Sequence, residues 1–168
     1  QRINADLAND FGNLSQRVLS MIFKNCDGVI PAPQPFTDED QAMLKMAYDL
    51  PDQLRQEYDR QAIHRALETQ WRVVAEANRY VDAQAPWGLK KTDPERMGTV
   101  LYVLAEVIRN LALLAQPIVP QSAAVILDQL KQAEEGRDFS ALGPDGALQP
   151  GLVMDKPEPV FPRFVEAE

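Results

Sequence analysis

Apolar residues recur at steps of three and four along most of the chain, the spacing that places them on one side of an α-helix. The first such stripe spans about Ile3 to Lys24 and contains Ile3, Leu7, Phe11, Leu14, Val18, Met21 and Ile22. The second follows Thr37, and Asp40 three residues later completes the pattern of a capped helix start. We expect this second helix to reach about Leu50, where Pro51 would kink or interrupt it.

Three further helices are predicted downstream. The third covers roughly Tyr58 to Ala83, and its inner face contains Ile63, Leu67, Val74 and Val81. Asp93 and Pro94 are a typical N-cap and first-turn pair, and they begin the most apolar helix of the set. Two prolines separate this fourth helix from a short fifth helix over about 121–132.

The rest of the chain lacks helical periodicity. Residues 136–151 have the composition of a loop, and the proline-punctuated segment Pro157–Val165 predicts an extended strap. The sequence therefore predicts an all-α protein. Residues 1–135 would form an antiparallel helical bundle, and residues 136–168 would form a loop and a C-terminal strap that packs on the bundle or on another domain.

Composition narrows the classes of function. The chain has 168 residues, of which 45% are hydrophobic and 25% charged, as expected for one globular domain. We see no apolar run long enough to span a bilayer and no signal peptide, so no membrane partner is expected. The net charge of −8 argues against binding DNA, or coating RNA, through bulk charge.

The chain has few residues that could hold a metal ion. Cys26 is the only cysteine and His64 the only histidine, which argues against an internal disulfide or a zinc site. We expect His64 to be structural, beside the apolar face of the third helix, because a lone histidine lacks a second catalytic group.

The stretch from Asn78 to Lys91 contains the strongest candidate for binding. A helical run ends at Pro86, and Trp87 follows immediately, with Gly88 and two lysines after it. Pro86 places Trp87 on a turn, and an exposed aromatic ring beside cations is one way to stack an unpaired nucleic-acid base. The alternative is that Trp87 covers the core of the bundle, since burial is common for tryptophan.

Asn13 and Arg17 form a second candidate. They lie four residues apart and therefore share one side of the first helix. An amide and a guanidinium together can contact base edges or hold phosphates. The alternative is a solvated polar flank in which Asp10 pairs with Asn13 or Arg17.

These stretches together resemble the anticodon-binding domain of bacterial-type methionyl-tRNA synthetases, which are class I aminoacyl-tRNA synthetases. The similar segments are R-I-N-A-D-L-A-N-D-F-G-N-L-S-Q-R at 2–17, Asn78 with Pro86-Trp87, L-L-A-Q-P-I-V-P at 113–120, and F-P-R-F at 161–164. The resemblance spans nearly the whole chain, and the combination of the first two motifs is its most specific part.

The resemblance implies a role for each candidate residue. Asn13 and Arg17 match the family's anticodon-reading positions, Trp87 matches the tryptophan that stacks on an anticodon base, and Pro86 matches the proline that positions it. The implied partner is the anticodon loop of tRNA(Met). We expect the Trp87 ring to be at least partly exposed and to face the same cleft as Asn13 and Arg17.

The resemblance also implies what this chain does not contain. We expect it to be a piece of a larger cytoplasmic methionine–tRNA ligase, with the catalytic domain upstream in the same chain. ATP with Mg²⁺, methionine and zinc would bind to that domain, and this fragment would hold no cofactor and catalyse nothing itself. Two alternatives stay open: the same fold in a synthetase for isoleucine, valine, leucine or cysteine, or a helical module whose Trp87 contacts a partner protein.

Overall fold

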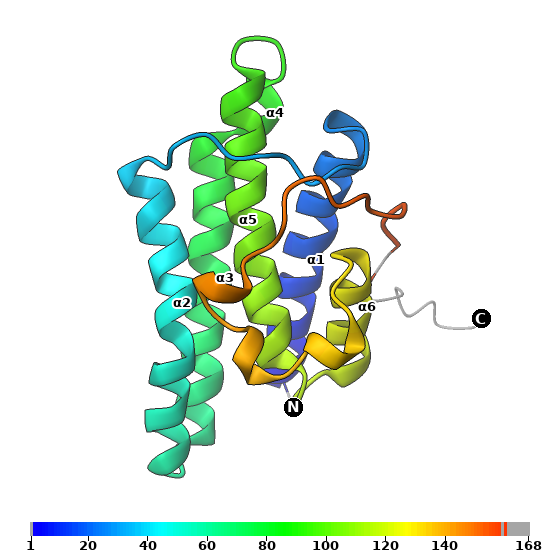
Figure 1. Cartoon of the computed structure of the whole chain (residues 1–168). Coiled ribbons are helices and arrows are strands. Elements are labelled where there is room, and N and C mark those ends of the chain that lie inside the picture. Colours follow the sequence, from blue (N-terminus) through cyan, green and yellow to red (C-terminus); the bar gives the residue numbers. More distant parts are fainter. Residues whose placement is uncertain (1, 159, 161–168) are drawn as a thin grey trace, which may run out of the picture.

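The structure, a computed structural model, describes residues 2–158 and residue 160, with side chains from Asn9 onward. The helices in this part are α1 (Arg2–Asn25), α2 (Asp38–Asp59), α3 (Ile63–Gln84), α4 (Pro86–Leu89), α5 (Pro94–Ala115) and α6 (Pro120–Gln129), followed by the 3₁₀ turns η1 (Glu134–Gly136), η2 (Phe139–Ala141) and η3 (Pro144–Gly146). The four long helices stand side by side and alternate in direction along the chain (Figure 1). The predicted all-α bundle is confirmed.

Helix α5 forms the centre of the bundle. Every residue from Met97 to Ala115 is buried, and α1, α2, α3 and α6 all pack against this helix. By length and hydropathy alone α5 would suit a membrane span, contrary to our interpretation of the sequence. Because the surrounding helices bury it completely, we assign it as the core helix of the domain.

The boundary between the second and third helices differs from the prediction. Helix α2 continues through Pro51 to Asp59, because Leu50 and Leu54 extend its buried face on both sides of the proline. Helix α3 therefore begins later, at Ile63.

The predictions for two side chains at the start of α3 were also wrong. Ile63, expected on the inner face, is 62% exposed because it lies in the first turn, beyond the last buried layer at Ala66. His64 is exposed too, and its Nε2 lies 3.0 Å from Glu68 one turn later instead of beside the core.

The two helix starts at which the sequence predicted a cap, Thr37 and Asp93, are capped as expected. Thr37 and Asp40 form a reciprocal capping box at α2, and Asp93 accepts a hydrogen bond from the Arg96 amide at α5. Asp40 is fully buried and has two further partners. Tyr80 of α3 donates to it at 2.5 Å, and the Arg96 guanidinium of α5 donates two bonds at 2.6 and 2.9 Å. One carboxylate thus connects three helices.

The stability of the bundle should depend on the ionisation of Asp40. Burial alone would raise the pKa of Asp40, but hydrogen bonds from Arg96, Tyr80 and Thr37 outweigh it and hold the pKa below its usual value. A lowered folded-state pKa stabilises the fold above the unfolded pKa of about 4, and the contribution is lost as the pH falls through the folded value.

We therefore expect Asp40→Asn to lower the free energy of unfolding at neutral pH, and the gap from the unsubstituted protein to shrink as the pH falls below about 4. Urea denaturation at a series of pH values measures this. Asp38→Asn, on an exposed residue of the same helical turn, is the matched control. A gap that stays constant down to about pH 2 would contradict the role of Asp40.

The segment after η1 packs on the bundle. Tyr102 of α5 donates a hydrogen bond to the Leu148 carbonyl at 2.7 Å, and the backbone at 151–154 bonds to Gly28 and Ile30 in the α1–α2 loop. Figure 1 shows this segment crossing in front of α5 and α1. The predicted loop at 136–151 thus includes 3₁₀ turns, and most of the predicted strap at Pro157–Val165 lies outside the described residues.

A fully buried set of polar side chains on α5 holds this segment. We call it the α5 polar cluster: Glu106, Arg109 and Asn110. Arg109 donates to Glu106 at 2.7 and 2.9 Å and to the carbonyls of Ala141 and Gly143 at 2.5 and 3.0 Å. Glu106 also accepts from the Tyr48 hydroxyl, the Leu148 amide and the Asn110 amide group.

Candidate nucleic-acid interface

The backbone between α3 and α5 presents Trp87 to solvent. Ala85 has a left-handed conformation, with φ +44°, which ends α3 and redirects the chain into α4. Pro86 is buried, and Leu89, three residues later on the same side of α4, packs against the core. Trp87 lies between these two anchors and is 51% exposed. The expectation that its ring is at least partly exposed is confirmed.

Arg17 lies directly against this ring. The guanidinium carbon of Arg17 is 5.0 Å from the centroid of the Trp87 ring, which is the distance range of a cation–π contact. Asp82 of α3 accepts a hydrogen bond from the same guanidinium at 2.9 Å. The side chains of Arg17 and Asp82 are 41% and 65% exposed, so the arrangement is open to solvent.

Asn13 occupies the neighbouring position on α1. It is exposed one helical turn before Arg17, about 6 Å along the helix and on the same side. The structure therefore brings Arg17 and Trp87 into contact and places Asn13 beside them. We name the exposed set Asn13, Arg17, Asp82 and Trp87 the Trp87 surface.

The partner of Arg17 was not predicted. Asp10, the expected partner of Arg17 or Asn13, instead accepts a hydrogen bond from the Trp71 indole nitrogen at 2.9 Å. The alternative in which Asp10 neutralises this flank is therefore wrong. Asp82 carried one usable signal: it lies in the last turn of a helix, where the helix dipole disfavours an acid, so another contact was to be expected.

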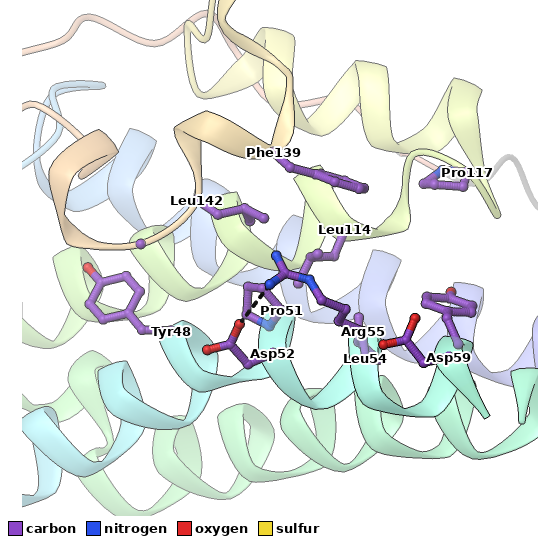
Figure 2. Close-up of a pocket in the computed structure, with 12 residues that line it drawn as sticks. Tyr48, Pro51, Asp52, Leu54, Arg55, Asp59, Leu114, Pro117, Phe139 and Leu142 are labelled. Carbon is purple, nitrogen blue, oxygen red and sulfur yellow. Dashed lines mark ion pairs between the residues drawn. The ribbon is translucent and has the colours of Figure 1, made fainter. Parts of the chain in front are cut away.

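A cavity of about 540 Å³ lies toward the opposite end of the bundle from α4. Figure 2 shows it between α2 and the segment that carries Phe139 and Leu142, with the Asp52–Arg55 pair at its edge. None of the predicted site residues lines it.

The described part of the chain also contains no group of three or more His, Cys, Asp or Glu residues that could hold a metal ion.

Comparison with known proteins decides the family. A family model described as "Anticodon binding domain of methionyl tRNA ligase" matches residues 30–168. The chain belongs to this family. Its relatives include the methionine–tRNA ligases of Rhizobium meliloti, 53% identical over 99% of the chain, and of Mycobacterium tuberculosis, 48% identical over 97% of the chain. The chain spans 32% of the length of each.

Solved structures agree with the sequence relatives. Methionyl-tRNA synthetase of Mycobacterium tuberculosis in its apo form superposes with a TM-score of 0.91 at 46% identity, covering 99% of this chain and 34% of that one. The same enzyme bound by methionyl-adenylate gives a TM-score of 0.90 at 47% identity over 96% of this chain and 32% of that one. The sequence relatives align through α1 as well, so Asn13 and Arg17 lie inside the matched region.

These findings bear on the alternatives left open by the sequence. The relatives and the solved structure named above are methionine–tRNA ligases or methionyl-tRNA synthetases, not synthetases for isoleucine, valine, leucine or cysteine. The family match likewise favours an anticodon-binding domain over a general protein-interaction module.

Proposed function

We propose that this chain recognises the anticodon loop of tRNA(Met), as the C-terminal domain of a cytoplasmic methionine–tRNA ligase. The observation that supports this most directly is the half-exposed Trp87 ring with the Arg17 guanidinium stacked against it. In such a ligase the catalytic domain of the same chain would bind ATP with Mg²⁺ and carry out aminoacylation, and this domain would supply recognition.

The geometry suggests how a loop base is held. A splayed base stacks on the open part of the Trp87 ring, a contact that needs an aromatic face and no net positive charge. Arg17 is preorganised beside that base because Asp82 and the ring fix its guanidinium from two sides. The donors of Arg17 and the amide of Asn13 are then available to contact base edges. Recognition of this kind is compatible with a chain of net charge −8.

We expect Arg17→Ala to relax discrimination between anticodons. A guanidinium that contacts a base edge contributes about 1–3 kcal/mol of discrimination, so its loss weakens cognate tRNA selectively. The measurement is the Kd of the ligase that contains this domain for tRNA(Met) and for a panel of tRNAs with other anticodons. Arg17→Lys keeps the charge but removes the planar fork, and it should relax discrimination as well.

An equal loss of affinity for every tRNA in the Arg17→Ala variant would sink the base-reading role, because it would make Arg17 a phosphate contact. Arg55→Ala is the matched control, since Arg55 is an exposed arginine on α2 that also lies beside an aspartate. It should leave both affinity and discrimination unchanged.

A further inference from the structure

Three arginines form a row along the outer side of α3. Arg65, Arg72 and Arg79 recur every seven residues, and all three are exposed. Seven residues are close to two helical turns, so the side chains are about 10.5 Å apart along one side and span about 21 Å in total. The buried residues Val74 and Val81 of α3 lie on the opposite side. We call Arg65, Arg72 and Arg79 the α3 arginine row.

The acids of α3 do not neutralise this row completely. Glu68 lies against His64, and Asp82 pairs with Arg17. Glu76 pairs with Arg79 across the helix surface. Among the described residues, no ion pair or side-chain hydrogen bond involves Arg65 or Arg72. The row therefore offers at least two guanidinium groups to an anion.

The neighbouring helix α2 is strongly acidic. Helix α2 carries seven acids, Asp38, Glu39, Asp40, Asp49, Asp52, Glu57 and Asp59, against two bases, Lys45 and Arg55. Helix α3 carries three arginines against three acids, Glu68, Glu76 and Asp82. A polyanion bound at the end of the bundle is therefore repelled along α2 and meets no net repulsion along α3. The Arg17–Asp82 pair joins α1 to α3, so the Trp87 surface borders the C-terminal end of α3.

We propose that the α3 arginine row binds the phosphate backbone of an RNA stem whose loop rests on Trp87. The inference rests on the proposed function, and it adds the double-stranded part of the RNA to the single-stranded loop. Arg79 lies five residues, about one and a half turns, before the end of α3 at Gln84, so the row begins near the loop-binding surface and continues away from it. The guanidinium fork matches phosphate geometry, and such contacts position the RNA without reporting its sequence.

The test compares Arg65→Gln/Arg72→Gln with the unsubstituted protein in titrations against two RNAs. One is the anticodon stem-loop of tRNA(Met), and the other is its single-stranded loop alone. We expect the double variant to bind the stem-loop roughly tenfold more weakly and to lower the slope of log K against log salt by about 1.5–2. Binding of the single-stranded loop should not change. The loss should be the same for a stem-loop with an altered anticodon.

A double variant that binds the stem-loop with unchanged affinity and salt slope would overturn the proposal. Equal weakening toward the stem-loop and the loop alone would overturn it too, since the row would then contact the loop. Arg55→Gln controls for the loss of surface charge, and the thermal midpoint of each variant checks that the bundle is intact.

Trp87→Ala in the same titrations separates this proposal from the proposed function. If Trp87→Ala weakens RNA binding and the double variant does not, anticodon recognition stands and only the proposal for the α3 arginine row is wrong. If the unsubstituted protein binds neither RNA, even at low salt, both the proposed function and the proposal for the α3 arginine row are wrong. If the α3 arginine row binds an acidic protein instead of RNA, the double variant should bind the stem-loop with unchanged affinity, and that result overturns the proposal.

Discussion

Replacing Trp87 by alanine should weaken the binding of tRNA(Met) by roughly 5- to 150-fold, because stacking on one aromatic side chain contributes roughly 1–3 kcal/mol per base. The loss should appear in the Kd for tRNA and in the tRNA charging rate of the ligase that contains this domain. Activation of methionine by ATP should stay unchanged, since that step needs no tRNA and belongs to the catalytic domain of the proposed ligase.

The fold should tolerate this substitution. Pro86 and Leu89 attach α4 to the core, whereas half of the Trp87 residue is already open to solvent. Within the domain, the substitution mainly removes the cation–π interaction between the ring and the Arg17 guanidinium. A weaker tRNA complex can therefore be assigned to the missing ring, provided that the thermal midpoint of the variant stays close to that of the unsubstituted protein.

Two further variants sharpen the test. Trp87→Phe keeps an aromatic face and should recover most of the affinity. Ile63→Ala removes a large exposed apolar side chain from the other end of α3 and should leave tRNA binding unaltered. Unchanged tRNA kinetics in Trp87→Ala would show that the ring contacts no base, and anticodon recognition through this surface would have to be abandoned.

The sequence predicted the candidate binding residues of the Trp87 surface, but it did not predict which charged residues pair there. Pro86 restricts the backbone locally, so the end of α3 followed from residue chemistry. The same chemistry left Trp87 open to burial, and its exposure was expected only from the resemblance to the family. The contact between Arg17 and Asp82 joins residues 65 positions apart on two helices. Local periodicity indicates which side of a helix faces the core, but it does not identify the partner of a polar side chain.

The same limit of local sequence rules explains why the second helix was predicted to reach only about Leu50. Pro51 breaks the local rule for helices, yet the burial of Leu50 and Leu54 keeps the helix continuous. Helix α5 shows the converse case: its apolar residues were recognised from the sequence, and its charged pair was not. Glu106 and Arg109 are three residues apart, a spacing also typical of solvated surface pairs, and their burial depends on long-range packing, including that of residues 136–148 over them.

This burial gives the α5 polar cluster a large effect on stability. Arg109→Met is expected to lower the free energy of unfolding by about 3–5 kcal/mol, because it leaves the Glu106 carboxylate buried without its cation. It also removes the donors to the Ala141 and Gly143 carbonyls. For a domain of this size the midpoint of thermal unfolding should fall by on the order of 10 °C. Urea denaturation and a thermal melt measure the two quantities.

The chain contains its own matched control. Arg79 and Glu76 form a pair with the same residue types and the same spacing, but on the surface of α3. Arg79→Met should cost less than about 1 kcal/mol, because solvent screens an exposed pair. Equal destabilisation by Arg79→Met and Arg109→Met would contradict the importance of burial.

A double variant separates the cost of an unpaired charge from the loss of packing. Glu106→Gln/Arg109→Met removes both charges and should be more stable than Arg109→Met alone, since no uncompensated carboxylate is then buried. Limited proteolysis adds a local readout, because the carbonyls that Arg109 binds belong to the segment that packs over α5. Cleavage within 136–148 should therefore accelerate in Arg109→Met before the whole bundle unfolds, whereas Arg79→Met should show the original cleavage rate.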